Sequence, residues 1–163
     1  MTASAIVIGG WTIRGSNGAG TTSLLVTIGP GKTIGPYCHW LFTNIGGYSG
    51  SVPGSQSYST AEITDDGGAA VVNASSVIVD QVGMSTGSAY KEGTILAPLT
   101  TNTDQGYERK PGGVSGSGQD TDNNATDFAV TAPSDPQWHQ SPCITAPTAT
   151  ESESWGAVKS LYR

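Results

Sequence analysis

Charged residues are scarce in this chain of 163 residues. They make up 12% of it, against about 25% in a typical soluble domain. Lysine and arginine total seven against 13 acidic residues, which gives a net charge of −6. Binding of phosphate backbones needs a clustered basic surface, and the basic residues here stand singly except Arg109 and Lys110. Nucleic acid is therefore not expected as a partner.

Long apolar runs are also lacking. Without an apolar run of about 18 residues, no membrane span is expected. The chain does not open with a charged stretch followed by an apolar one, so no signal peptide is expected. Good helix formers are concentrated only in Trp155–Arg163, where Trp155, Val158, Leu161 and Tyr162 fall near one helical face. So short a segment is not stable alone in water, and we expect a short helical or extended tail.

Turn-forming residues are plentiful, with 23 glycines and nine prolines between short β-prone runs. A Gly/Ser-rich stretch, Gly46–Thr60, predicts a long loop. The expected strands are Ala3–Ile8, Trp11–Arg14, Ser23–Ile28, Tyr37–Thr43, Gly106–Lys110 and Phe128–Val130. Several short strands with frequent turns are typical of a single all-β domain, an antiparallel β-sandwich.

The densest β-branched content lies in Ile63–Gly83. Val71–Val72 and Val77–Val82 form two β-prone runs, and the polar quartet Asn73–Ser76 connects them. This arrangement predicts a β-hairpin. Apolar residues fall on both faces of the second run, so we expect the hairpin in the interior of the β-structure.

The two cysteines, Cys38 and Cys143, are far apart in the chain. They are either two unrelated thiols or a disulfide that fastens the C-terminal segment to the domain. A disulfide closing so long a loop would contribute about 3–5 kcal/mol on an entropic model. Both interpretations stay open at this stage, whereas a zinc site is not expected from so dispersed a set.

Two short motifs resemble functional sites, but the residues around them exclude those functions. Gly31–Thr33 resembles the end of a phosphate-binding loop, but Val26 stands where the first glycine is needed and Gly35–Pro36 prevents the helix that must follow. Cys38 and His39 look like a nucleophile beside a base. Neighbours on a strand point to opposite faces, so no catalytic dyad is expected.

The acidic loop, Asp120–Asp127, is the sharpest chemical feature. Asp120, Asp122 and Asn124 occupy positions 1, 3 and 5 of a calcium-loop spacing, and Asp127 follows. The glycine and glutamate of a helix-loop-helix calcium site are lacking at positions 6 and 12. Two interpretations stay open: a looser Ca²⁺ site formed by these four residues, or a loop whose side chains accept hydrogen bonds from backbone amides.

Two further sets of side chains are weaker candidates for a functional site. Four aromatic residues would suit a sugar-stacking surface or, equally, the core of the domain: Trp40, Tyr48, Tyr58 and Trp138. Five acidic residues could supply a catalytic pair: Glu62, Asp65, Asp66, Glu92 and Glu108. Such catalysis needs two carboxylates at a defined separation, which the sequence does not fix.

Several short motifs follow one another over about residues 8–137. They are Gly10–Ile13, Ile28–Pro36, Leu41–Asn44, Ile63–Val82, Tyr107–Lys110, Asp120–Phe128 and Pro133–Pro136. In this order they resemble the lamin tail domain family, in its bacterial secreted branch. The agreement includes G-W-x-φ at Gly10–Ile13 and D-T-D-N-N-x-x-D-F at Asp120–Phe128, while Gly106 stands where the family usually has serine.

The resemblance implies an immunoglobulin-like β-sandwich over residues 1–137, followed by an extended Pro/Thr-rich tail over 138–163. It implies no catalytic residues, so we expect a non-catalytic protein-interaction or cell-surface binding module. A carbohydrate-binding module is the alternative, and a hydrolase accessory domain a more distant one. The family implies an extracellular or cell-surface location, while the lack of a signal peptide leaves a cytoplasmic one open.

The family begins with two strands that this sequence lacks, so we expect an open sheet edge. An unpaired edge is a template for another strand. Ala3–Ile8 and Ser134–Ala146 could pair with it, either within the chain or on a neighbour, and Trp155–Arg163 could cover exposed apolar surface. We therefore expect a homo-oligomer, most simply a two-fold dimer in which one of these segments crosses between subunits.

Overall fold

The computed structural model describes residues 4–60, 63–99, 101 and 103–144. Over these residues the chain consists of strands and loops, with a single helical turn, α1 (Asn124–Asp127), and a short 3-10 helix, η1 (Gly113–Ser115). This confirms an all-β fold. The tail Trp155–Arg163 and Glu62 lie outside the described residues. In the part of the chain that is described, no helix has the length and apolar character that crossing a membrane requires.

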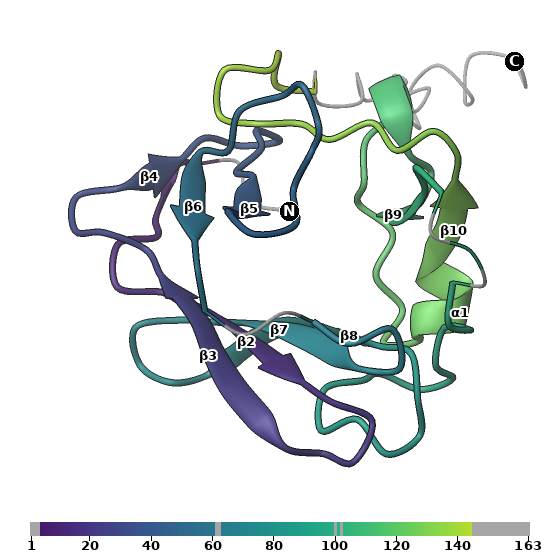
Figure 1. The fold of residues 1–163 in the computed structure, drawn as a ribbon. Coiled ribbons are helices and arrows are strands. Elements are labelled where there is room, and N and C mark those ends of the chain that lie inside the picture. Colours follow the sequence, from purple (N-terminus) through teal and green to yellow (C-terminus); the bar gives the residue numbers. More distant parts are fainter. Residues whose placement is uncertain (1–3, 61–62, 100, 102, 145–163) are drawn as a thin grey trace, which may run out of the picture.

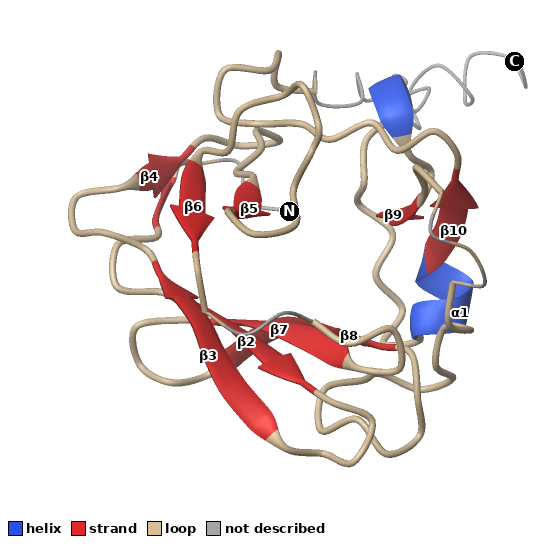
Figure 2. Cartoon of the chain, in the orientation of Figure 1, coloured by secondary structure: helices blue, strands red, loops and turns tan. Residues whose placement is uncertain are grey.

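A four-stranded antiparallel sheet is the largest element, with strand order β3-β2-β7-β8. Three two-stranded pairs accompany it: β1–β4 and β9–β10 are antiparallel, and β5–β6 is parallel. Figures 1 and 2 show the four-stranded sheet along one side of the molecule, with β4, β5 and β6 on one flank and β9 and β10 on the other. The strands are β1 (Ile6–Val7), β2 (Thr12–Ser16), β3 (Thr22–Thr27), β4 (Thr33–Ile34), β5 (Phe42–Asn44), β6 (Gln56–Tyr58), β7 (Gly68–Val72), β8 (Ile78–Gly83), β9 (Gly106–Arg109) and β10 (Phe128–Thr131).

The expected hairpin is confirmed as β7 and β8. The Asn73 side chain closes its turn by accepting hydrogen bonds from the backbone N–H groups of Ser75 and Val77, at 2.9 and 3.0 Å. The expectation that the whole hairpin is interior is wrong. β8 has a neighbour on one side only, and Val77, Ile78 and Val79 are 57%, 44% and 50% exposed. The β-branched run therefore forms a sheet edge.

The core lies mainly against the four-stranded sheet. Its buried apolar members are Ile8, Leu25, Val26, Ile28, Ala70, Val72, Tyr90 and Leu96. Leu25 and Val26 are both buried although they are neighbours in a strand. A register shift between Ile13 and Arg14 leaves Leu25 without a direct partner on β2, and such a bulge turns two successive side chains inward.

The aromatic segment Tyr37–Thr43 is a strand only at its end, so that prediction is largely wrong. Tyr37 has a left-handed backbone with φ of 57° after the turn at Gly35–Pro36, a conformation incompatible with a regular strand. Only β5 pairs, and its partner β6 lies within the stretch for which the sequence predicts a loop.

Two segments that were candidates to cross between subunits are paired within this chain. β1 pairs with β4, Ile6 opposite Ile34. The described part of Ser134–Ala146 runs back to the first half of the chain, where the Ile144 N–H donates to the Tyr37 carbonyl at 3.0 Å.

Candidate functional site

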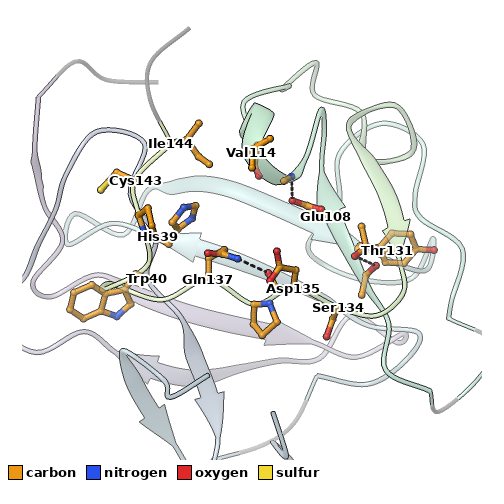
Figure 3. Close-up of a pocket in the computed structure, with 16 residues that line it drawn as sticks. His39, Trp40, Glu108, Val114, Thr131, Ser134, Asp135, Gln137, Cys143 and Ile144 are labelled. Atoms are coloured by element: carbon orange, nitrogen blue, oxygen red, sulfur yellow. Dashed lines mark hydrogen bonds between the residues drawn. The ribbon is translucent and has the colours of Figure 1, made fainter. Parts of the chain in front are cut away.

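A cavity of about 680 Å³ lies between β9, the η1 loop, residues 39–40 and the segment 134–144. Its walls are aromatic, aliphatic and acidic (Figure 3). The lining residues are His39, Trp40, Gly106, Tyr107, Glu108, Gly113, Val114, Ser117, Thr131, Ser134, Asp135, Pro136, Gln137, Pro142, Cys143 and Ile144. Ligand sites in proteins have volumes of about 300–1,000 Å³, so this cavity is large enough to receive one.

A strap made of residues 138–144 holds one wall of the cavity in place. Cys143 and Cys38 are joined by a disulfide between positions 105 residues apart. The His139 N–H donates to Ser55 Oγ at 3.0 Å, and Ser55 Oγ also accepts from the Leu41 N–H at 3.1 Å. The strap is thus fastened on both sides of His39 and Trp40, which fixes where these two side chains lie.

The acidic wall is built by Glu108 and Asp135. Glu108 lies in β9, and its Oε1 accepts a hydrogen bond from the Gly113 N–H at 2.6 Å, which draws the η1 loop over the cavity. Asp135 follows β10 in the segment that leads to the strap. Figure 3 shows both carboxylates turned toward the space between these two segments. Two like charges at one cavity favour a cationic group as ligand.

Two polar atoms beside the cavity are buried without a hydrogen-bond partner among the described residues. They are Nε2 of His39 and Nε1 of Trp40. An indole Nε1–H is a donor only, and leaving such a group buried and unpaired costs about 1–3 kcal/mol. Because these two atoms have almost no accessible surface, they lie behind the wall of the cavity and out of reach of a ligand in it.

A second polar cluster lies around Arg109, outside the cavity. Its guanidinium contacts Asp80 at 2.5 Å, Asp120 at 3.4 Å and Asp127 at 3.8 Å, and its side chain is 11% exposed. The guanidinium also lies 4.5 Å from the centre of the Phe128 ring, a cation–π distance. This cluster ties β8, β9 and the acidic loop together, and the sequence alone gives no sign that one arginine joins three separate aspartates.

In the acidic loop, the proposed calcium ligands are occupied by the protein itself. Asn124 is fully buried, and its Oδ1 accepts from the Gly83 and Glu92 N–H groups, both at 3.0 Å. Asp127 is also fully buried and accepts from the Thr121 N–H at 2.8 Å. These contacts agree with the second interpretation, side chains that satisfy backbone amides.

The other two proposed ligands do not join them. Asp120 is more than half exposed and pairs with Arg109, and Asp122 is exposed with a left-handed φ of 56°. Among the described residues, no group of three or more histidine, cysteine or acidic side chains lies so as to hold a metal ion.

Burial and hydrogen bonding shift the pKa values of this network in opposite directions. Burial alone would raise the pKa of Asp127, but hydrogen bonds from Thr121 and Asn123 outweigh it and lower that pKa. The pKa of Asp80 is raised, because burial outweighs the attraction of Arg109. The pKa of Glu92 is raised by burial and by the neighbouring charge of Asp80.

The remaining candidate residues from the sequence do not come together in one site. Cys38 is in a disulfide, so it is no thiol beside His39, and Gly31–Thr33 passes from a turn into β4. Of the five acidic candidates for catalysis, Glu108 alone is among the described residues that line the cavity.

Of the four aromatic candidates, Trp40 lines the cavity. Trp138 lies near it through His139, whose ring centre is 4.8 Å from that of Trp138 and 5.7 Å from that of Trp40. The Tyr48 hydroxyl donates to the Val52 carbonyl at 2.7 Å. Tyr48 and Tyr58 are not among the lining residues, so the four rings form no single platform.

Comparison with known proteins finds no matching family model, no matching curated protein and no matching solved structure.

Proposed function

We propose that this chain is a non-catalytic binding module of the lamin tail type, with an immunoglobulin-like β-sandwich, that takes a protein partner at the cell surface or outside the cell. The observation that carries the proposal is the cavity beside the strap, with its aromatic and acidic lining. The antiparallel β3-β2-β7-β8 sheet and the smaller pairs are compatible with a sandwich. The disulfide supports an oxidising location, where such bonds persist.

A screen for binding tests this function. The full chain is labelled and applied to a cell-surface protein array, with a Trp40→Ala variant as the control for the cavity. We expect selective protein binding by the wild type that the variant loses. Turnover by the chain on a panel of esters, glycosides and phosphoesters would contradict the non-catalytic assignment.

Carbohydrate binding is the second candidate, and the position of Trp40 at the cavity favours it. Aromatic side chains are the usual stacking partners of sugar rings, and Gln137 and Asp135 supply hydrogen-bonding groups at the same cavity. A glycan array decides between the two candidates. Specific sugar binding that Trp40→Ala abolishes would replace the protein partner by a glycan.

We also propose that the chain forms a homodimer through the beginning of β8, where Ile78 and Val79 are exposed, since the Asn124 side chain occupies the edge at Gln81 and Gly83. An exposed strand edge is self-complementary in backbone hydrogen bonding, and a two-fold axis pairs such an edge with itself. The exposed Val77, Ile78 and Val79 would be covered in this arrangement. Size exclusion with light scattering is expected to give a dimer that Val79→Lys converts to a monomer. A wild-type monomer at high micromolar concentration would contradict it.

A further inference from the structure

We infer that the cavity takes an extended peptide segment in which a lysine or arginine side chain lies next to an aliphatic residue. This inference rests on the proposed binding function and names the chemistry of its partner. It follows from three properties of the wall: its charge, its aromatic side chains and its aliphatic rim.

The charge of the wall is negative and is not neutralised by the protein. Glu108 and Asp135 line the cavity, and no lysine or arginine is among the described lining residues. The two cations that follow Glu108 in sequence are engaged elsewhere. Arg109 contacts three aspartates on the other side of β9, and Lys110 Nζ donates to the Thr126 carbonyl at 2.6 Å. A cation from a partner therefore completes this wall.

The aromatic side of the cavity fits an extended peptide. Aromatic-lined grooves recognise extended or polyproline-type segments, and His39 and Trp40 line this cavity.

The rim of the cavity accepts an aliphatic side chain. Val114, at the turn of η1, is 94% exposed, and Ile144, Pro136 and Pro142 lie in the opposite wall. Figure 3 shows Val114 and Ile144 on facing segments at one end of the cavity. A neutral sugar offers neither a cation to the carboxylates nor an aliphatic group to this rim.

The test uses an immobilised hexapeptide library probed with the labelled full chain. Three proteins are compared: the wild type, a Glu108→Gln/Asp135→Asn double variant, and an Asp65→Asn/Asp66→Asn double variant. The last pair is exposed, lies outside the cavity and makes the same change in net charge. The amide that replaces the Glu108 carboxylate retains an acceptor for the Gly113 N–H, and urea unfolding of each variant checks that its fold is unchanged.

We expect the wild type to select peptides that combine lysine or arginine with an aliphatic neighbour. The cavity double variant should bind the selected peptides about tenfold more weakly, since the loss of one half-buried ion pair at Glu108 and one exposed ion pair at Asp135 is of this order. The Asp65/Asp66 variant should stay within about twofold. Trp40→Ala, which removes a ring from the wall of the cavity, should weaken all selected peptides by about fivefold without changing their sequence preference.

Selection of peptides without lysine or arginine, or unchanged binding by the cavity double variant, would overturn the inference. Binding on a parallel glycan array without peptide selection would overturn it as well, while leaving a binding function in place. Binding on neither array, nor to the protein array, would overturn the proposed function itself.

Discussion

The buried side chain of Asn124 is expected to be a main support of this fold. Its amide pairs with three backbone groups that have no strand beside them: it accepts from the Gly83 and Glu92 N–H groups and donates to the Gln81 carbonyl, all at 3.0 Å. One side chain thus satisfies two positions of the β8 edge, as a neighbouring strand would. Asn124→Ala leaves all three groups unpaired.

The magnitude follows from these contacts. Each buried backbone group left unpaired costs about 1–3 kcal/mol, and relaxation or entry of water offsets part of the sum. We expect a loss of about 4 kcal/mol, near the upper end of single-substitution effects. With a urea m-value of about 2 kcal/mol per molar, the unfolding midpoint should fall by about 2 M.

The neighbouring asparagine provides the matched control. Asn123 caps α1 by accepting a longer, exposed hydrogen bond of 3.3 Å from the Thr126 N–H, so Asn123→Ala should cost only about 1 kcal/mol. Both variants are unfolded in urea and followed by circular dichroism. If Asn124→Ala is no more destabilising than Asn123→Ala, the side chain does not act as a substitute strand.

Three further predictions concern the acidic loop, the disulfide and pH. Because the oxygens of Asn124 and Asp127 are already bound to amides, millimolar Ca²⁺ should leave the melting temperature equal to that in EDTA, and a rise with Ca²⁺ concentration would restore a metal site. A Cys38→Ser/Cys143→Ser variant should lose about 4–5 kcal/mol, because the cross-link spans 105 residues; an unchanged urea midpoint would contradict this. Asp127 has a lowered pKa, so its contribution is present above about pH 4 and is lost as the pH falls through that lowered pKa. The raised pKa values of Asp80 and Glu92 instead make stability rise as the pH falls from neutral toward about 4. The free energy of unfolding, measured with urea across pH, should therefore have its maximum near pH 4. In the Asp127→Asn variant it should no longer fall below pH 4.

Local sequence was sufficient for the features that depend on neighbouring residues. The β7–β8 hairpin follows from two β-branched runs and an asparagine-led turn, and the Asn73 side chain makes the turn contacts that such a residue favours. The same pattern could not show that β8 is an edge, because a β-branched run suits either position and strand order depends on distant parts of the chain.

The candidate site depends on contacts that are distant in sequence. Trp40, Glu108 and Asp135 meet at one cavity only because the strap returns to Cys38. The sequence left this disulfide as one of two interpretations. The acidic loop was predicted to bring four oxygen ligands together, but Asp120 and Asp122 lie apart from the buried Asn124 and Asp127. The backbone amides that Asn124 binds belong to Gly83 and Glu92, which are distant in sequence. The spacing of oxygen-bearing residues in the loop alone does not show whether their oxygens bind backbone amides or a cation.

The Trp40 indole N–H gives the most direct measurement of the central claim, which is that the cavity beside the strap binds a partner. The chain has four tryptophans, so a ¹H–¹⁵N spectrum contains four indole signals, and Trp40→Phe identifies one of them. On titration with a partner from the protein or peptide screen, the Trp40 signal should shift more than the other three, because Trp40 lines the cavity. A partner that binds while the Trp40 signal stays fixed and the amides of β8 shift instead would contradict the account.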